Sequence, residues 1–438
     1  MREAQPRQMA GKKPERVLVV GDDMRIFLAV VRSLGRAGKE VQAAPFDWRA
    51  PALTSKYIAK VHRLPRYSDD PQGWLAALLK LLDEEAIDLV VPCCDRAILP
   101  LDAHREALFS YRIAIPNARA MDLLFDKQRT KALAQSLGIP VSAGAQLGRD
   151  DSAPSLAARF GLPLVVKPRR SYWLDRLESW GKVHIAEDVA ALAGVLASLD
   201  DPPRYLAEAF FERGVGVGLS VLADEGAILQ AFQHRRMREG WGGSSSYRIS
   251  EALQPDLLDA CRKLCAATRL TGVCMFEFRR NADDGSWILL ETNARFWGSL
   301  PLPVAIGVDF PLRLFNLLVE GQRPPAIGYR SGIRSRNIVL DAFNLLAGLR
   351  RLPPGGLPRW LLEVGDFLLQ PARWLAGREH ADSFAADDFA PGFAECGAVL
   401  RSLGARTNRG FRLRRRSDRP QLSDAGVSSV REPEAETL

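Results

Sequence analysis

The chain has 438 residues, of which 47% are hydrophobic and 26% are charged. These fractions are typical of globular proteins, so the composition excludes a disordered, collagen-like or fibrous chain, and the length leaves room for two or three domains. No apolar run is long enough to cross a bilayer, and the charged N-terminus lacks the apolar stretch of a secretion signal. We therefore expect a cytoplasmic protein without a transmembrane segment.

Residues 16–120 alternate between strand and helix patterns. The expected strands are 17–20, 41–44 and 88–92, and the expected helices are 26–37 and 74–85. This order predicts an N-terminal α/β domain with an open parallel sheet, preceded by a disordered N-terminus over residues 1–15. Ligands of such sheets bind beyond the carboxyl ends of the strands, where Gly21, Asp22 and Cys93–Asp95 fall. We expect Asp95 either to contact a substrate or to cap the helix that follows it.

A second domain is expected over residues 121–322. The apolar strand Leu162–Pro168 carries a lysine near its end. A lysine in such a strand must reach solvent or bind an anion, and phosphate is a natural partner for Lys167. The strand 204–211 leads into the sequence GVGVG at 214–218, which we interpret as a bend between two strands with close backbone approach, rather than as a phosphate loop.

The segment 230–250 concentrates basic side chains around a Gly/Ser loop. His234, Arg236 and Arg248 flank the sequence GGSSS at 242–246. Guanidinium groups beside such a loop are suited to binding a carboxylate or a phosphate. A basic surface loop without a ligand is the alternative interpretation.

Two β-prone runs flank a cluster of turn formers at 281–286, which predicts a β-hairpin. A turn centred on this cluster places Glu277 opposite Glu291, and the side-chain period of two puts Asn293 on the same face, together with Arg295. Two facing carboxylates among apolar neighbours repel each other and lose hydration unless a cation lies between them. A hard divalent ion with oxygen ligands meets this need. Ordinary surface carboxylates are the alternative.

Residues 323–403 are expected to form a helical appendage, used for core packing or domain closure. A membrane-surface helix over 360–375 is less favoured, because Glu363 and Asp366 do not suit anionic lipid. Seven arginines between Arg406 and Arg419, against Asp418, put a net charge of +6 into one segment of the region 404–438, which we interpret as a basic disordered tail. We do not expect a nucleic-acid partner; contact of the tail with an anionic membrane surface or with RNA is the alternative.

These residues resemble the ATP-grasp superfamily, in particular its carbamoyl-phosphate-synthase-like and carboxylate–amine ligase branch. The likeness runs from about Val17 to Gln322, and its most specific part is Glu277 together with the run Glu291–Arg295. The resemblance implies an N-terminal open parallel (pre-ATP-grasp) sheet, a two-lobed α+β ATP-grasp fold and a helical C-terminal appendage. It also implies ATP as the nucleotide and Mg²⁺ (or Mn²⁺) as the metal.

The resemblance assigns roles to individual residues. It implies that Glu277, Glu291 and Asn293 hold the metal ions that bridge the ATP phosphates, and that Arg295 stabilises the transferring phosphoryl group. The residues that it assigns to nucleotide binding are Lys127, Lys167 and the hinge Glu208, Ala209, Phe210, Phe211 and Glu212. The loop with His234, Arg236, Gly242 and Gly243 is similar to a segment near the acceptor and the phosphates.

Two stretches depart from the family pattern. After Lys167 the family has a short glycine-rich flap over the phosphates, whereas this chain has the sequence RRSYWL at 169–174. After the hinge, where an acid often holds the ribose, Glu212 is available. These departures bear on flap closure and on ribose contact.

We predict an ATP-dependent ligase that activates a small carboxylate as an acyl phosphate and joins it to an amine, such as an amino acid or a peptide-like acceptor. Catalysis would rest on charge neutralisation and positioning, without a protein nucleophile. The alternatives are a carboxylate kinase, a carboxylating ATP-grasp enzyme and a non-catalytic nucleotide-binding regulatory protein. The expected partners are small-molecule carboxylate and amine substrates, and a homodimer is the candidate assembly.

Overall fold

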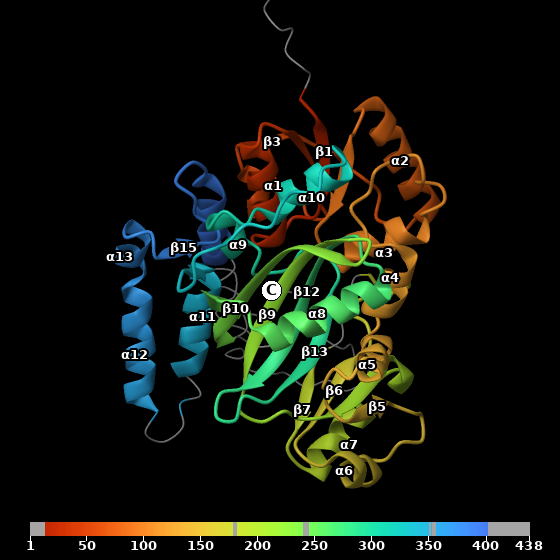
Figure 1. Cartoon of the computed structure of the whole chain (residues 1–438), viewed down its shortest axis with the longest axis vertical. Helices are drawn as coiled ribbons and strands as arrows, with labels where there is room; N and C mark the ends of the chain where they lie inside the picture. Colours follow the sequence, from red (N-terminus) through yellow and green to blue (C-terminus); the bar gives the residue numbers. More distant parts are fainter. Residues whose placement is uncertain (1–13, 178–181, 240–244, 350–351, 353–355, 402–438) are drawn as a thin grey trace, which may run out of the picture. The chain divides into compact units, whose positions relative to one another are not determined.

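The computed structural model describes residues 14–177, 182–239, 245–349, 352 and 356–401 (Figure 1). The chain divides into two compact units, Met1–Glu395 and Cys396–Leu438, and the elements named here belong to the first. The tail predicted over 404–438 lies outside the described residues, as do all but two residues of the predicted segment 1–15. Among the described residues, no helix combines the length and the apolar character that crossing a bilayer requires.

The N-terminal sheet is parallel, and its strands follow the order β3-β2-β1-β4. Its elements are β1 (Arg16–Val20), α1 (Ile26–Arg36), β2 (Glu40–Ala44), β3 (Ile58–Val61), α2 (Pro71–Glu84), β4 (Leu89–Pro92) and α3 (Asp95–Ala103). Alternating side chains of β1 are buried on both faces, because Val17 and Val19 pack with α1 whereas Leu18 and Val20 pack with α2. The open parallel sheet predicted from the sequence is confirmed.

A seven-stranded sheet forms the centre of the unit, in the order β13-β12-β9-β10-β11-β14-β15. Its strands are β9 (Gly214–Asp224), β10 (Ala227–Glu239), β11 (Ser245–Glu251), β12 (Gly272–Asn281), β13 (Trp287–Asn293), β14 (Arg334–Arg336) and β15 (Glu379–Ala381). Helix α8 (Pro255–Thr268) covers one face, where Leu257 and Leu264 pack against Leu219 (Figure 1). On the opposite face Met275 and Phe232 belong to the core that α1 also lines.

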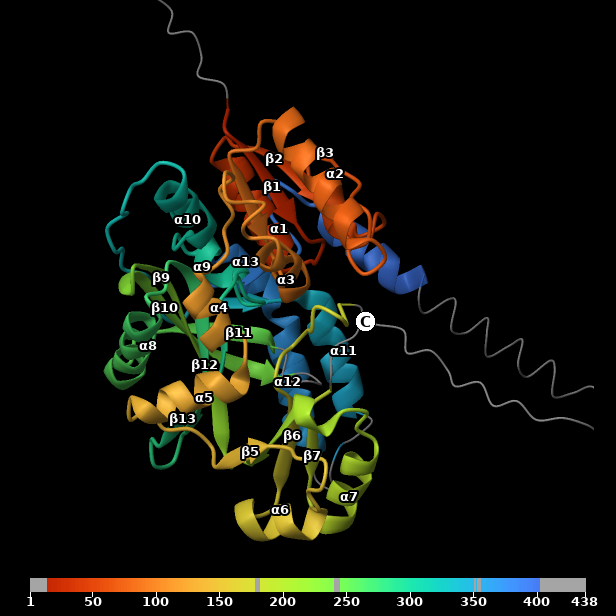
Figure 2. The ribbon, with the colours of Figure 1, turned by 90° about the vertical axis from the view of Figure 1, so that its right-hand side faces the viewer.

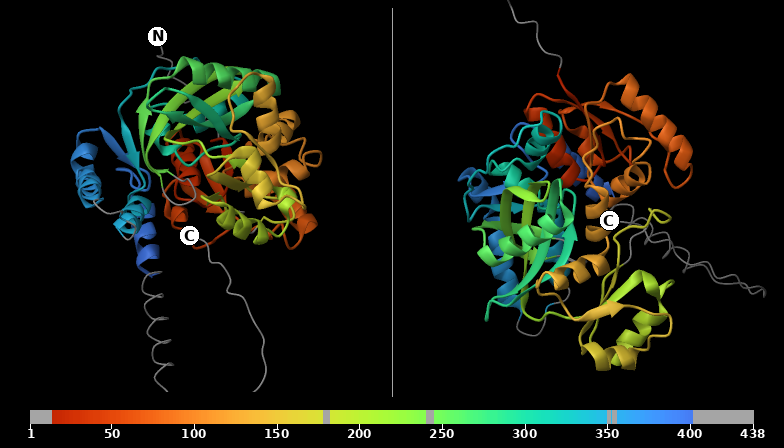
Figure 3. Two further views of the ribbon diagram at one scale, coloured as in Figure 1. Left: turned by 90° about the horizontal axis from the view of Figure 1, so that it is seen from below. Right: turned by 45° about the vertical axis from the view of Figure 1, so that its right-hand side comes forward.

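A four-stranded sheet, β5-β8-β6-β7, forms the smaller lobe. Its elements are β5 (Gly144–Gln146), α6 (Ala153–Phe160), β6 (Leu164–Pro168), β7 (His184–Ala186), α7 (Val189–Ala197) and β8 (Tyr205–Ala209). Helices α6 and α7 cover this sheet through Leu156 and Leu192, which pack on Leu164 (Figure 2). In Figure 3 the N-terminal sheet (red) and the small sheet (yellow) both adjoin the large sheet (green). The two-lobed α+β fold predicted for this region is confirmed.

The remaining helices connect the sheets and complete the C-terminal part. They are α4 (Ala118–Leu124), α5 (Lys127–Ser136), α9 (Pro301–Ala305), α10 (Phe310–Leu318), α11 (Ile338–Leu349), α12 (Leu357–Leu368) and α13 (Gln370–Leu375). The predicted helical C-terminal region is present. It also supplies β14 and β15, which the sequence did not predict because strands of three residues carry too short a pattern.

The glycine run at 214–218 lies inside β9, so the predicted bend between two strands is wrong. The predicted close approach is confirmed, because a Cβ atom built at Gly218 would lie 2.2 Å from Cε1 of His234, and one built at Gly216 would lie 2.7 Å from Cδ of Arg236. Glycines at alternate positions share one face of a strand. They therefore make room on that face for the side chains of the neighbouring strand β10.

Candidate active site

The hairpin β12–β13 brings the two predicted acidic residues together. Glu277 pairs directly with Glu291, and Met275 pairs with Asn293. A β-bulge lies between Glu277 and Phe278, and Phe278 pairs with Leu289, so Leu290 is the extra residue. The carbonyl oxygen of Leu290 accepts a hydrogen bond of 3.3 Å from Nζ of Lys167. The predicted register is thus confirmed, and the bulge turns a backbone oxygen towards the small sheet.

Cationic and amide groups hold the two carboxylates. Arg236, on β10, donates to Oε2 of Glu277, and Nδ2 of Asn293 lies 3.4 Å from Oε1 of the same residue. Nζ of Lys127 lies 3.6 Å from Oε2 of Glu291. The structure therefore brings together five predicted site residues from four different elements, the two acids among them.

The two acids differ in their readiness to ionise. Burial raises the pKa of Glu277, and Glu291 raises it further, while Arg236 opposes both effects. Burial also acts on Glu291, but Lys127 and Lys167 outweigh it and lower the pKa of this carboxyl. Glu291 is therefore the more readily charged member of the pair.

Glu208 links the small sheet to α5 through its side chain, a role that the sequence did not predict. Its two carboxylate oxygens lie 2.9 Å from Nζ of Lys167 and 2.7 Å from Nζ of Lys131. All three side chains are buried. Burial raises the pKa of Glu208, but the two lysines outweigh it and the net shift is downward. Lys131 was missed, although its position one helical turn after Lys127 is a signal that both reach the same side of α5.

The predicted hinge, Glu208 to Glu212, spans the end of β8, which closes at Ala209. The N–H groups of Ala209 and Phe210 donate to backbone carbonyl oxygens, of Ala143 at 2.8 Å and of Pro163 at 3.1 Å. A nucleotide would therefore compete with existing backbone bonds at these two positions. The prediction of a nucleotide-binding hinge therefore rests on Phe211 and Glu212, which lie beyond the strand.

Asp95 and Arg295 join the N-terminal sheet to the large sheet. Nε of Arg295 lies 2.6 Å from Oδ1 of Asp95, and a second guanidinium nitrogen lies 3.3 Å from Oδ2. Burial disfavours the charge on Arg295, but Asp95 outweighs burial and raises the pKa of the guanidinium. The predicted cap is wrong: Cys94 holds the N-cap position of α3, and Asp95 is the first helical residue. Its carboxylate is committed to Arg295 instead.

His234 is buried on the same face as Arg236, with its ring over Gly218. Burial, followed by Arg236 and Arg248, lowers the pKa of His234 well below its ordinary value, so the imidazole is neutral. Its Nδ1 atom has no hydrogen-bond partner among the described residues. Gly242 and Gly243, predicted beside it, lie outside the described residues.

The segment after Lys167, which contains no glycine at 169–174, lines part of the site. Arg170, Ser171 and Tyr172 line a recess whose other walls include Asp95 and Lys127. Burial raises the pKa of the Tyr172 hydroxyl, so this hydroxyl stays protonated and can donate a hydrogen bond. The departure from a glycine-rich flap therefore brings polar side chains to the recess.

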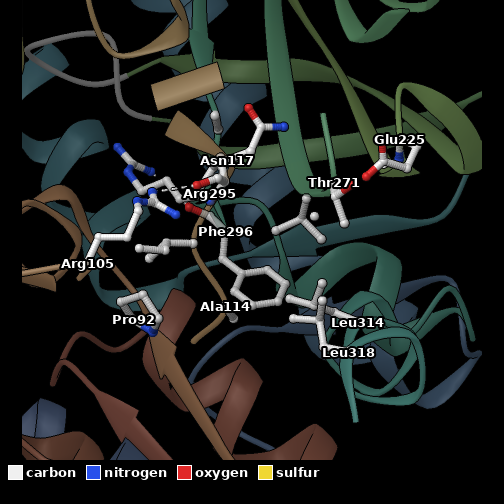
Figure 4. A pocket seen from close by; sticks show the side chains of 15 residues that line it. Pro92, Arg105, Ala114, Asn117, Glu225, Thr271, Arg295, Phe296, Leu314 and Leu318 are labelled. Atoms are coloured by element: carbon white, nitrogen blue, oxygen red, sulfur yellow. Dashed lines mark hydrogen bonds between the residues drawn. The ribbon is translucent and has the colours of Figure 1, made fainter. Parts of the chain in front are cut away.

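A separate pocket of about 290 Å³ is lined in part by Arg295 (Figure 4). Its walls combine Phe296 and Leu314 with the polar residues Arg105 and Asn117. These polar groups already have partners, since Arg105 binds Asp102 and Asn117 accepts from the N–H of Ala120. These two polar side chains therefore do not need a ligand to complete their hydrogen bonds.

The donor set at the hairpin suits magnesium. Among the described residues, no group of three or more His, Cys, Asp and Glu side chains is arranged to hold a metal ion. Glu277, Glu291 and Asn293 instead offer a few oxygen donors, and Mg²⁺ is commonly bound by one or two carboxylates together with substrate phosphates. These residues fit such an ion.

The N-terminal open sheet, the two-lobed region and the facing acids together define the ATP-grasp fold, and the chain is similar in sequence and in fold to members of the ATP-grasp superfamily. No family model matches the chain. Among curated proteins, it is 30% identical over 193 residues to the carbamoyl phosphate synthase large chain of Xylella fastidiosa (strain Temecula1), which covers 42% of this chain and 18% of that protein. The large chain of Methanosarcina barkeri matches at 23% identity over 310 residues, 68% of this chain and 27% of its own length. The chain thus spans about a fifth to a quarter of these relatives.

Solved structures share the fold at low sequence identity. Biotin carboxylase from Campylobacter jejuni matches with a TM-score of 0.57 and 16% identity, covering 74% of each chain. An L-amino acid ligase from Bacillus licheniformis matches with a TM-score of 0.54 and 17% identity, over 72% of this chain and 78% of that one. N5-carboxyaminoimidazole synthetase from Staphylococcus aureus, complexed with ADP, matches with a TM-score of 0.55 and 15% identity, over 72% and 80%.

Proposed function

We propose that the chain is an ATP- and Mg²⁺-dependent ligase that joins a small carboxylic acid to an amine, with an amino acid or a peptide-like molecule as acceptor. The observation that carries this proposal is the direct pairing of Glu277 with Glu291, held by Arg236 and Lys127. Two paired acids, held by cations that can also contact phosphate, suit phosphoryl transfer.

Mg²⁺ would be held by Glu277, Glu291 and Asn293, and when bound it would neutralise charge on the phosphates. Lys127 and Lys167 would contact the phosphates, and Phe211 and Glu212 would lie beside the base and the ribose. The buried carboxylate of Glu208 fixes the position of Lys167, so this lysine is oriented before a nucleotide arrives. Arg295, anchored by Asp95, would neutralise the transferring phosphoryl group.

The proposed reaction has two steps. First, a carboxylate oxygen of the acid attacks the γ-phosphorus of ATP; the bond to the bridging oxygen breaks, and ADP leaves. Second, the amine attacks the carbonyl carbon of the acyl phosphate; phosphate leaves with the electron pair of the broken C–O bond, and the amine nitrogen loses a proton. His234, neutral and close to Arg236, would lie near the acceptor. No protein nucleophile is needed.

The structural neighbours support this class, because an L-amino acid ligase shares the fold. The test is release of ADP and phosphate by the purified chain with ATP, Mg²⁺ and pooled amino acids and small carboxylates. Glu291→Gln should abolish turnover, while Asp283→Asn, in the exposed turn of the same hairpin, should keep most of it. Equal turnover in the wild type and Glu291→Gln would refute the metal-centred site.

A carboxylating enzyme is the second candidate, because biotin carboxylase and N5-carboxyaminoimidazole synthetase share the fold to the same extent. Bicarbonate in place of the organic acid pool would then sustain ADP release. A nucleotide-binding protein without turnover is also consistent with Arg236, which occupies one oxygen of Glu277. Tight ATP binding with no turnover on any pool would favour this last function.

A further inference from the structure

Arg25 lies where the N-terminal sheet meets the loop after β13. The strand order β3-β2-β1-β4 puts the topological switch point between β1 and β4, the position at which open α/β sheets bind ligands. Arg25 is the N-cap residue of α1, in the loop that follows β1, and its guanidinium lies against Gly298, where a Cβ atom would be only 3.1 Å from the nearest nitrogen. Gly298 is the third residue after Arg295, so Arg25 lies beside the loop that carries Arg295.

Among the described residues, the Arg25 guanidinium donates no hydrogen bond; only its backbone N–H does, to Asp23. A guanidinium has five N–H donors, and those that are removed from water need acceptors. Neighbouring buried arginines have them, since Arg248 binds Asp382 at 2.5 Å and Arg295 binds Asp95 at 2.6 Å. Arg25 therefore differs from the structural arginines around it.

Three acids, Asp23, Asp382 and Glu395, act electrostatically on the Arg25 guanidinium, and none of them accepts a hydrogen bond from it. Glu395 accepts from Asn337 through Oε1 at 3.5 Å, whereas its buried Oε2 has no hydrogen-bond partner among the described residues. The oxygens of Asp23 accept from three backbone N–H groups at the start of α1, at 2.6 to 3.1 Å. Those of Asp382 accept from Arg248 and from the hydroxyl of Ser335, at 2.5 and 2.6 Å. These charges favour the protonated guanidinium from a distance, but they leave its donors for another anion.

Arg25 is surrounded by protein without being fully buried. Burial among protein atoms lowers the pKa of its guanidinium, yet part of the side chain remains open to solvent. The planar fork of a guanidinium in such a place matches the two oxygens of a carboxylate.

We propose that Arg25 binds a carboxylate of the substrate other than the one that is activated. This inference rests on the proposed function, which it makes more specific. The substrate pair then includes either a dicarboxylic acid or an amine that carries its own carboxylate, as a free amino acid does. The shared chemistry is a carboxylate held by Arg25 at the switch point.

The test measures binding, so it does not depend on turnover. Succinate and glycine serve as probes for the two sources, and succinamate and glycinamide as their uncharged counterparts. Each is titrated calorimetrically into the full chain, with and without a non-hydrolysable ATP analogue and Mg²⁺. We expect succinate or glycine to bind Arg25→Gln about 10- to 100-fold more weakly than the wild type, as loss of a charge-assisted contact predicts. The amides should bind both proteins equally.

Controls separate the possible outcomes. Arg49→Gln, at an exposed position of the same domain, should leave binding unchanged, and Arg25→Lys should recover part of it. Unchanged analogue binding and melting temperature in Arg25→Gln would show an intact fold and nucleotide site. Equal affinity for the carboxylates in the wild type and Arg25→Gln, or no binding of either carboxylate by the wild type, would overturn the inference. Failure of the wild type to bind the analogue would instead count against the proposed function.

Discussion

Asp95 holds Arg295 through two contacts, so a residue that begins a helix of the N-terminal sheet anchors a residue that follows the hairpin of the large sheet. The two side chains are 10% and 16% exposed, so water screens the pair only in part. The position of Arg295 thus depends on the N-terminal domain, which links the switch point of that sheet to the phosphoryl-transfer site that we propose.

Asp95→Asn should reduce turnover more than it reduces stability. The neutral amide still accepts a hydrogen bond but no longer holds the guanidinium by charge, so we expect unfolding to become easier by about 1–3 kcal/mol. We expect kcat to fall about tenfold or more, because Arg295 is free to leave its position. Urea unfolding and steady-state ADP release measure the two effects.

Asp102→Asn is the matched control for this prediction. Asp102 lies on the same helix and pairs with Arg105, but that pair is about one-third exposed. Such pairs contribute little to stability. A similar loss of turnover in both variants would contradict the role given to Asp95.

Glu208→Gln should destabilise the fold in a pH-dependent way. Its carboxylate holds two buried ammonium groups, and removing the charge leaves Lys131 and Lys167 unpaired, at a cost of about 3 kcal/mol near neutral pH. The folded-state pKa of Glu208 lies below its ordinary value of 4.5. The stabilisation is therefore complete above about that pH and is lost as the pH falls through the lowered pKa.

Urea unfolding between pH ~3 and ~7 measures this difference. We expect the gap between the wild type and Glu208→Gln to be constant at the upper end and to shrink at the lower end. Glu212→Gln, an exposed position in the following segment, should show no gap at any pH. A gap for Glu208→Gln that widened on acidification would contradict the assigned ion pairs.

Gly218→Ala should destabilise the large sheet by about 1–3 kcal/mol, because the added methyl group would meet the ring of the buried His234. Gly194→Ala is the opposite case. Gly194 lies within α7 with open space around it, and alanine there should stabilise by about 0.5–1 kcal/mol. Thermal unfolding of both variants tests whether close approach, rather than flexibility, explains glycine in β9.

The hairpin was predictable because its information is local. Turn formers between two β-prone runs and a side-chain period of two suffice to place Glu277 opposite Glu291. The bulge at Leu290 was not predictable, because what favours it is not local. The carbonyl oxygen of the extra residue accepts a hydrogen bond from Lys167, which lies far away in the sequence. The roles given to the acids and the lysines stay predictions, as do the domain boundaries at 120/121 and 322/323.

Contacts between distant segments account for what the sequence did not reveal. Lys131 and Glu208 meet only because α5 packs beside β8, and no spacing rule connects them. The short strands β14 and β15 are recognisable only from the sheet edge that they extend. No sequence motif distinguishes Arg25. What distinguishes it is a guanidinium that donates no hydrogen bond among the described residues.

Arg236→Gln should shift the pH dependence of Mg²⁺-dependent ATP binding upward. Burial raises the pKa of Glu277, and Arg236 is the largest influence that lowers it. Without the guanidinium the carboxyl holds its proton to a higher pH, and a carboxylate must be deprotonated to bind a metal. Titrations of Mg·ATP affinity against pH should therefore show a midpoint displaced to higher pH. Arg235→Gln is the control, because Arg235 pairs with Glu251 and is 38% exposed. An unchanged midpoint in Arg236→Gln, with ATP still bound, would mean that Glu277 does not titrate with metal binding and that Glu291 acts without it.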